Sequence, residues 1–207
     1  MWQTKDSALI QRVLSTNLPL KIKKHNTMVL VDTGRKKTCL SVLEHLSAFE
    51  AETFKLIILT HTHHDHIENL SEILACFDVD VLVHISEADN VREFVNPEKL
   101  IVFTERFDLT SYGLNGYVVH TPGHSEGSST IVLNNEYALI GDIVGDIYTK
   151  KWAKNNKVLS LESLDSFHKI LGLKCRLYFP AHKKYIYSFE ELNNLVNRYM
   201  TGDRIIE

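Results

Sequence analysis

The densest group of potential metal ligands in this chain lies between residues 61 and 66. It reads His-Thr-His-His-Asp-His and directly follows an apolar run at 54–59. Neutral imidazole and carboxylate groups are good zinc ligands, and side chains at this spacing can turn towards one centre from a single loop. We therefore interpret four of these residues as metal ligands: His61, His63, Asp65 and His66. His64 stands at the odd position, and we expect it to face solvent or to support the ligands from behind.

Three further candidate ligands each follow a predicted strand, where a rigid scaffold can present a side chain from a loop. They are His124, after the tight turn Thr121-Pro122-Gly123, Asp142, after Ile140-Gly141, and His182, after Phe179-Pro180-Ala181. The two carboxylate oxygens of Asp142 could bridge two cations, and Asp146, four residues further on, is the rival for this role. We interpret His120, which directly precedes the turn, as a residue of the strand.

These seven candidate ligands are too many for one tetrahedral zinc ion. They suit two ions, one held by three imidazoles and the other by one aspartate and two imidazoles, with Asp142 shared. Coordination to a metal can lower the pKa of a bound water towards about 7, which makes a nucleophile available at neutral pH. The ligand set therefore predicts hydrolysis that needs no serine or cysteine nucleophile.

The elements that must position these residues follow one another with short connections, as in a layered α/β or α+β domain. Patterns of apolar residues predict strands at 18–24, 27–31, 54–59, 79–84, 100–103, 114–120, 128–133, 137–140 and 175–179. Helices are predicted at 37–49, 67–77, 86–95, 161–171 and from Ser188 onward. Ser160 is expected to cap the helix at 161–171, and Ser188 with Glu191 has the pattern of a capping box. Asn134-Asn135 is expected to form a tight turn between two strands.

The order of these motifs resembles the metallo-β-lactamase-fold superfamily over residues 28–182. The resemblance rests on Val31-Asp32-Thr33-Gly34, on His-x-His-x-Asp-His at 61–66 and on His124, Asp142 and His182. It implies an α+β fold, a four-layer αββα sandwich, with two divalent ions at one edge between the sheets. It also implies the partition of the ligands: His61, His63 and His124 to one ion, Asp65, His66 and His182 to the other, and Asp142 to both. Asp32 would orient the histidine loop from behind, and Asp65 would position or deprotonate the attacking water.

Two departures from the family pattern stand beside the expected ligands. Glu68-Asn69 occupies positions where the family often has glycines, and His182 follows Pro180-Ala181 where the family often has Pro-Gly. Neither change removes a ligand, so we expect them to alter the shape of the pocket mouth. The segment 143–156 is expected to border the pocket, and the roles of Tyr148, Lys150, Lys151 and Trp152 stay unassigned.

The loop Thr121 to Gly127 is similar to that of glyoxalase II-like thioester hydrolases. Only about 25 residues follow His182, so the C-terminal helical region that binds glutathione in longer members is expected to be largely absent. We therefore expect a short glyoxalase II-like hydrolase of a small thioester, ester or lactone, with zinc as the metal and iron or manganese as substitutes. The alternative is an oxidoreductase similar to persulfide dioxygenases, with one iron on His61, His124 and Asp142. A β-lactamase, a nuclease or a non-catalytic metal-binding protein fits less well.

The composition of the chain indicates its domain number, its class of partner and its compartment. The chain has 207 residues, 44% hydrophobic and 24% charged, and we expect one domain spanning 1–207. A formal charge of -3 gives no general attraction to nucleic acid or to anionic membranes, so the expected partner is a small-molecule substrate. The three cysteines are widely spaced, and no N-terminal signal peptide is recognisable. Both features favour a cytoplasmic protein, while the oligomeric state stays open.

Overall fold

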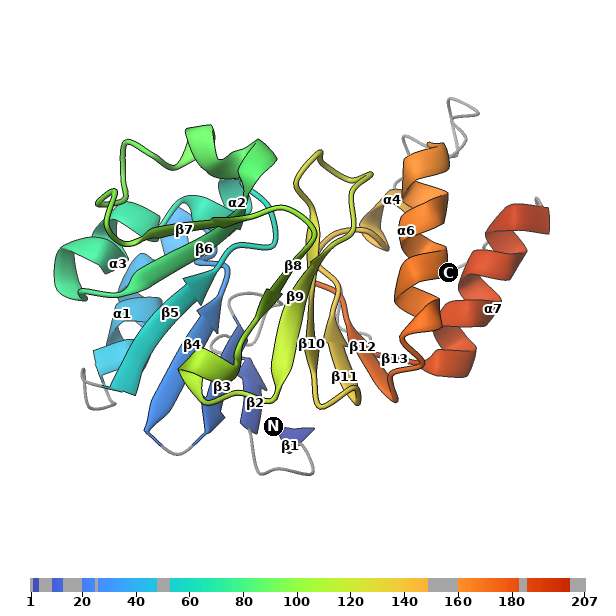
Figure 1. Ribbon diagram of the computed structural model, residues 1–207, viewed down its shortest axis with the longest axis horizontal. Coiled ribbons are helices and arrows are strands. Elements are labelled where there is room, and N and C mark those ends of the chain that lie inside the picture. The colour runs from blue at the N-terminus through green and yellow to red at the C-terminus, as the bar shows by residue number, and fades with distance from the viewer. Residues whose placement is uncertain are drawn as a thin grey trace.

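The computed structural model describes residues 2–3, 9–12, 20–24, 26–47, 53–148, 160–182 and 186–201. Two β-sheets face each other in the centre of the molecule (Figure 1). The first has seven strands in chain order: β1 (Trp2–Gln3), β2 (Leu9–Arg12), β3 (Leu20–Lys24), β4 (Thr27–Val31), β5 (Phe54–Ile58), β6 (Asp80–His84) and β7 (Leu100–Phe103). Strands β1 to β4 pair antiparallel, and β4 to β7 pair parallel.

The second sheet has six strands in the order β13-β12-β11-β10-β9-β8. Its strands are β8 (Arg106–Asp108), β9 (Gly116–His120), β10 (Ser129–Leu133), β11 (Tyr137–Leu139), β12 (Leu177–Phe179) and β13 (Tyr187–Ser188). Strands β8 to β11 form an antiparallel meander, and β12 pairs parallel with β11. Because β9, β11 and β12 run in one direction, the residues that follow them meet at one edge of the sheet.

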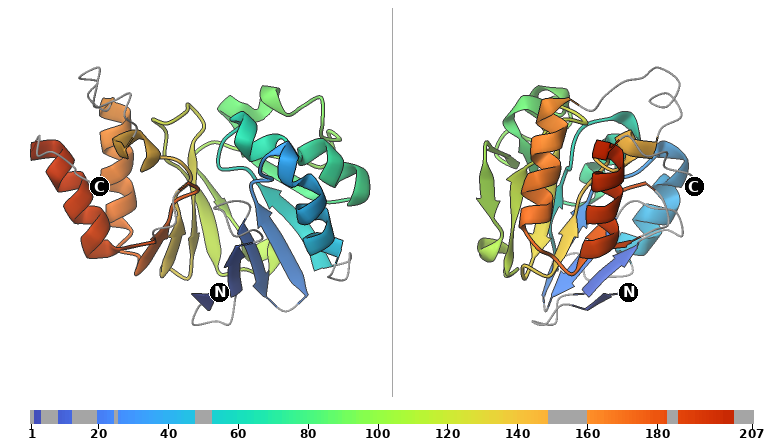
Figure 2. Two further views of the ribbon diagram at one scale, coloured as in Figure 1. Left: turned by 180° about the vertical axis from the view of Figure 1, so that it is seen from behind. Right: turned by 90° about the vertical axis from the view of Figure 1, so that its right-hand side faces the viewer.

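Helices cover the outer face of each sheet (Figure 2). The first sheet is covered by α1 (Cys39–Ser47), α2 (His64–Ile67) and α3 (Leu70–Cys76), and the second by α4 (Gly145–Tyr148), α6 (Leu161–Gly172) and α7 (Phe189–Thr201). Short 3₁₀ turns are η1 (Lys36–Thr38), η3 (Ile85–Asn90) and η4 (Thr110–Tyr112). This is a four-layer αββα sandwich, and the predicted fold class is confirmed. No helix in the described part of the chain is long and apolar enough to cross a membrane.

Three apolar cores hold the four layers together. Strand β4 contributes side chains to two of these cores. Val29 and Val31 face the second sheet, whereas Met28 and Leu30 face the helices. This alternation is the period of two of a β-strand, and both faces are buried because helices cover the outer one. The third core packs α6 and α7 on the second sheet, with Phe167 and Tyr178 fully buried in it. The strand ends are therefore held from both sides.

Most predicted elements are confirmed, and those that were wrong have an identifiable cause. The helix predicted at 67–77 begins at His64 and breaks at Glu68-Asn69, because the Asn69 side chain donates to the carbonyl of Thr33 (2.7 Å). The helix predicted at 86–95 is the 3₁₀ turn η3 followed by further turns, and Glu87 there points into the protein. Strands β1, β2, β8 and β13 were not predicted.

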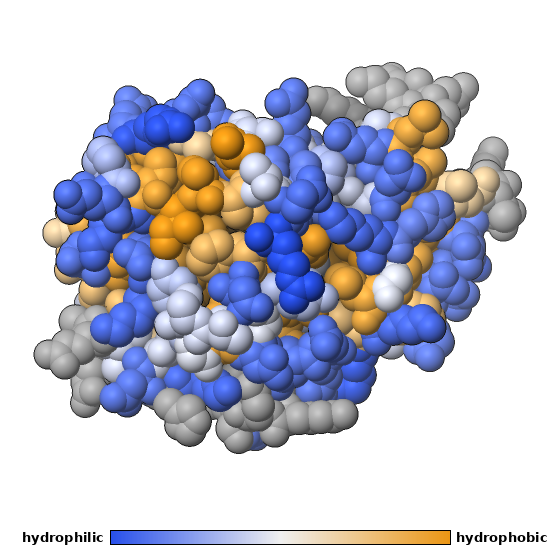
Figure 3. All heavy atoms as spheres, viewed as in Figure 1, coloured by the Kyte–Doolittle hydropathy of each residue, from blue (hydrophilic) through white to orange (hydrophobic). Residues whose placement is uncertain are grey.

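The edge strand β7 carries the apolar surface that is most evident in Figure 3. Val102 on this strand and Phe94 before it are each 42% exposed, and the orange area in the figure lies over this region. A second apolar area lies over α6, whose first residue, Leu161, is 82% exposed. Most of the remaining surface in this view is hydrophilic.

Candidate metal centre

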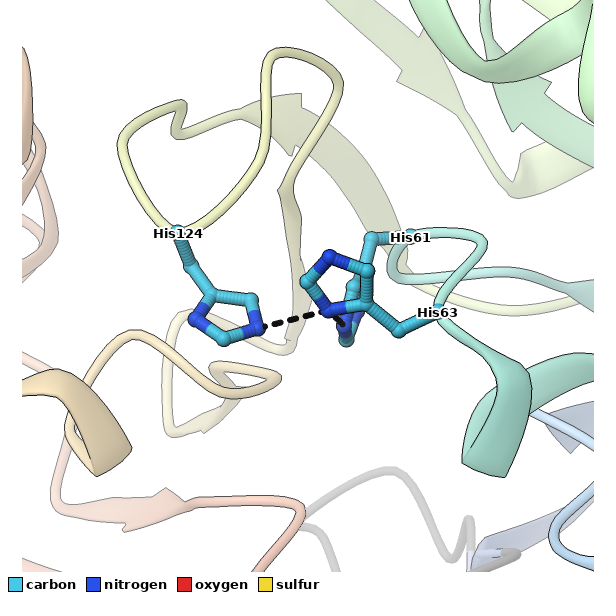
Figure 4. Close-up of side chains that lie close together, drawn as sticks. All are labelled: His61, His63 and His124. Carbon is cyan, nitrogen blue, oxygen red and sulfur yellow. Dashed lines mark hydrogen bonds between the residues drawn. The ribbon is translucent and has the colours of Figure 1, made fainter. Parts of the chain in front are cut away.

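The first group of candidate ligands joins the two sheets. His61 and His63 lie on the loop that follows β5, and His124 lies on the loop that follows β9 (Figure 4). His63 Nδ1 is 3.0 Å from His61 Nε2 and 3.0 Å from His124 Nε2. Two ligands of a tetrahedral zinc ion with bonds of about 2.0–2.1 Å are roughly 3.3 Å apart. The three nitrogens therefore converge at a spacing that suits one cation.

The second group lies beside the first and contains Asp65, His66 and His182. Asp65 and His66 project from α2, the helical turn that starts directly after His63, and His182 lies on the turn that follows β12. Asp65 Oδ2 is 3.0 Å from His182 Nε2. The three donor atoms lie within 4.8 Å of one another, as do those of the first group.

Asp142 lies between the two groups. Its Oδ2 atom is 3.1 Å from His182 Nε2, 3.4 Å from His66 Nε2 and 3.6 Å from His124 Nε2. Gly141, with φ of 52°, brings this residue close to the histidine loop, where an added Cβ would be 3.2 Å from the Thr60 side chain. The structure thus brings all seven predicted residues together at the edge between the sheets.

Two buried atoms test whether a cation fits here. Asp142 Oδ1 and His66 Nε2 are buried and have no hydrogen-bond partner among the described residues. Buried polar atoms are rarely left unpaired, because losing their contact with water costs free energy. Imidazole nitrogen and carboxylate oxygen are suitable ligands for zinc. The donor set and its unpaired atoms fit divalent metal ions.

The protonation states of His61 and Asp142 suit a role as metal ligands. Burial lowers the pKa of His61 to about 2, and nearby His66 adds to this effect. The His61 imidazole is therefore neutral and has a lone pair available. Burial would raise the pKa of Asp142, but the neighbouring His182 and His66 side chains outweigh it and hold the pKa far below its usual range. Asp142 is therefore ionised.

Asp32 lies behind His66, where the sequence had suggested a supporting role. Its Oδ2 atom accepts a hydrogen bond from His66 Nδ1 (2.9 Å), and its Oδ1 atom accepts one from the Thr60 amide (2.8 Å). Both side chains of the pair are fully buried. Burial alone would lower the pKa of His66, but Asp32 and Asp142 outweigh it and raise the pKa to about 10. Without a metal, His66 is therefore protonated at neutral pH, and a cation bound at Nε2 would replace the proton there while Asp32 keeps the one on Nδ1.

We expect Asp32→Asn to weaken binding of a divalent metal ion by about 10–100-fold, as is usual when a partner of a ligating histidine is lost. Asparagine tolerates the left-handed backbone at this position (φ 58°), so the fold is expected to persist. Competition with a chelating dye measures the change. Unchanged metal affinity would show that Asp32 does not orient a ligand.

Three residues near the centre were missed as contacts of the site. Arg35 donates from Nη2 to Asp65 Oδ2 (3.2 Å). Glu68 accepts from the Lys36 amide (2.9 Å), and Asn69 binds the carbonyl of Thr33. The residues that replace the family's glycines therefore tie α2 to the segment 33–36. Only their departure from the family pattern drew attention to Glu68 and Asn69, and nothing in the sequence marked Arg35.

The remaining candidates lie elsewhere. His64 is exposed, as expected. His120 ends β9 and stacks on His84 with ring centroids 3.8 Å apart, and it belongs to neither ligand group. The side chains of Asp146 and Tyr148, and residues Lys150, Lys151 and Trp152, lie outside the described part of the chain. The choice between Asp142 and Asp146 therefore rests on the position of Asp142 alone.

Two facing sheets, helices outside them and a histidine–aspartate cluster at their shared edge define the class of metal-binding αββα proteins. The chain belongs to the metallo-beta-lactamase superfamily, whose family model matches residues 22–182. The family resemblance seen in the sequence is therefore confirmed, and the protein is a member of a superfamily of metallo-hydrolases.

Relatives with similar sequences include proteins named for hydrolysis. A probable metallo-hydrolase of Methanocaldococcus jannaschii is 30% identical over 152 residues, 67% of this chain and 71% of that protein. A hydroxyacylglutathione hydrolase of Actinobacillus pleuropneumoniae is 24% identical over 176 residues, 82% of this chain and 67% of that enzyme. A beta-lactamase-like protein 2 homolog of Drosophila melanogaster is 29% identical over 163 residues, 74% of this chain. The match spans only 54% of the Drosophila protein.

Solved structures support the fold. A motif mutant of a metallo-beta-lactamase from Cronobacter sakazakii superimposes with a TM-score of 0.70 at 14% identity, covering 93% of this chain and 91% of that one. A flavoprotein from Thermotoga maritima superimposes with a TM-score of 0.71 at 18% identity, covering 88% of this chain and 51% of that one. At these identities the likeness establishes the architecture and leaves the metal roles of the seven residues as predictions.

Proposed function

We propose that this protein is a hydrolase that holds two divalent metal ions, zinc first among them, and cleaves a small thioester, ester or lactone. The observation that carries the proposal is the position of Asp142 Oδ2, 3.1 Å from His182 Nε2 and 3.6 Å from His124 Nε2. One carboxylate thus faces both ligand groups, as a bridge between two ions would. His61, His63 and His124 would hold the first ion, and Asp65, His66 and His182 the second.

Bound there, the two ions would lower the pKa of a water towards about 7 and polarise a carbonyl oxygen. The side chains around them have separate tasks. Asp65 is held by Arg35 on one side and faces His182 on the other, and its carboxylate would orient the attacking water and accept its proton. Asp32 fixes the ring of His66, and Asp142 keeps the two ligand groups at one separation.

The relatives favour this reaction class. The hydroxyacylglutathione hydrolase relative acts on a thioester by its name, and its match covers 82% of this chain. A single iron on His61, His124 and Asp142 would use only part of the cluster. The convergence of Asp65, His66 and His182 favours two ions over one. A flavo di-iron protein from Thermotoga maritima shares the fold, so the test includes iron.

The test uses metal-free protein reloaded separately with zinc, manganese and iron. Each form is offered S-acyl thioesters, lactones and β-lactams near pH 7. We expect the zinc form to hydrolyse thioesters fastest, with activity lost on chelation and restored by zinc. Failure of every metal form on every substrate would contradict the proposal, and thiol-dependent oxygen uptake by the iron form would replace it with the oxidoreductase.

A further inference from the structure

Glu87 is a buried carboxylate that is not among the candidate ligands. It lies in η3, directly beyond β6, and is 6% exposed. Its Oε1 atom accepts hydrogen bonds from Ser125 Oγ (2.5 Å) and from the Gly127 amide (3.1 Å). Its Oε2 atom accepts from Thr62 Oγ1 and from Asn90 Nδ2 (3.4 Å). Both carboxylate oxygens therefore accept hydrogen bonds, and each oxygen binds a different set of partners.

Two of the partners of Glu87, Thr62 and Ser125, are sequence neighbours of the first ligand group. Thr62 stands between His61 and His63, and Ser125 directly follows His124. Thr62 belongs to the loop after β5 in the first sheet, and Ser125 to the loop after β9 in the second. One carboxylate thus binds both loops that carry the three imidazoles. Asp65, His66 and His182 are not among the hydrogen-bond partners described for Glu87.

The contact between Glu87 and the loop after β9, here called the second loop, requires a residue without a side chain. A Cβ added to Gly127 would lie 2.2 Å from Glu87 Cγ and 3.2 Å from His84 Cβ. The turn that carries Glu87 makes one more contact with the loop after β5, here called the first loop, because Asn90 Nδ2 also donates to Thr62 Oγ1 (2.8 Å). The second loop is closed by its own hydrogen bond from the Thr121 amide to the Ser128 carbonyl (2.8 Å). Glu87 therefore connects two preformed loops.

We propose that Glu87 is a positioning residue for the first metal ion. It sets the distance between the loop of His61 and His63 and the loop of His124, and so determines whether three imidazoles can meet on one cation. Asp32 has the corresponding task for the second ion through His66. The inference rests on the proposed function, because it assigns a role towards ions that the seven ligands would hold.

The test measures zinc affinity in two backgrounds that each keep one ligand group. His182→Ala keeps the three imidazoles of the first group, and His124→Ala keeps the second group. We expect Glu87→Ala to weaken zinc binding about 10–100-fold in the His182→Ala background. In the His124→Ala background the change is expected to stay within about twofold, as for independent sites. Competition with a chelating dye gives both values without any assay of activity.

Matched variants separate positioning from general damage. Gly127→Ala changes the other side of the contact, and it should weaken zinc binding in the same background as Glu87→Ala. Glu87→Gln keeps an oxygen acceptor and the size of the side chain, so it should lose less affinity and serves if the alanine variant does not fold. Glu93→Ala removes an exposed carboxylate from the neighbouring turn and should change nothing.

Equal weakening in both backgrounds would overturn the inference, because it would show a general structural effect. Unchanged affinity in the His182→Ala background would overturn it as well. Both results presuppose a parent protein that binds zinc. A parent that binds none would instead overturn the proposed function itself, so the two failures are distinguishable.

Discussion

Asp142→Ala is expected to reduce hydrolysis by at least about 10²–10³-fold, because polarisation by a metal contributes several kcal/mol to the transition state. Asp142 Oδ2 faces His66, His182 and His124 at 3.1–3.6 Å, so its loss removes a ligand from both groups at once. The measurement is kcat/KM for the best thioester at saturating zinc, with zinc content determined on the same sample.

Asp78→Ala is the matched control, because this aspartate is 85% exposed and contacts Lys99 away from the cluster. It should retain parental activity and zinc content. Asp142→Asn keeps an oxygen but loses the charge, so its activity should lie between that of the parent and that of the alanine variant. An Asp142→Ala protein with two zinc ions and parental activity would show that Asp142 is not the bridge, and Asp146 would then be the residue to replace.

The second large effect is expected at Asp65, where alanine should reduce hydrolysis by about 10²–10⁴-fold, the usual contribution of a general acid or base. Asp65 Oδ2 is 3.0 Å from His182 Nε2 and 3.2 Å from Arg35 Nη2. The carboxylate is thus a candidate ligand and, in the proposed function, the group that would orient the attacking water. Steady-state kinetics at saturating zinc measure the loss.

Zinc content separates the two roles of Asp65. A variant that keeps two ions but loses activity would assign Asp65 to the proton transfer, and a variant that keeps one ion would assign it to the ligand set. Arg35→Ala is the companion variant, because it removes the cation that holds Asp65 and leaves all seven ligands. If Asp65→Ala hydrolyses the substrate as fast as the parent, the assignment of the second ion is wrong.

Local rules explain why much of the fold could be predicted. Asn134 and Asn135 both have positive φ (55° and 51°), as the tight turn between β10 and β11 requires. Ser188 and Glu191 form the predicted capping box, with hydrogen bonds of 2.7 and 3.2 Å between amides and side chains. Ser160 accepts a hydrogen bond from the Ser163 amide and so caps α6 as predicted. Each feature depends on residues within four positions of one another.

The features that were missed depend on distant partners. Strands β1 and β13 have two residues each and are defined by the strand beside them, which no local pattern reveals. The break at Asn69 depends on Thr33, 36 residues earlier. At the site, residue type and order predicted which seven residues would meet. Glu87 was not predicted, because its partner Ser125 lies 38 residues away and an isolated glutamate carries no signal in the sequence.

In the proposed function, the Asp142 carboxylate joins two ligand groups into a two-metal centre. The most direct measurement is the metal content of purified protein, reloaded with excess zinc and freed of unbound metal, without reference to any substrate. We expect two zinc ions per chain in the parent and one in His124→Ala and in His182→Ala. A parent chain that binds no zinc, or only one ion at saturating zinc, would contradict this expectation.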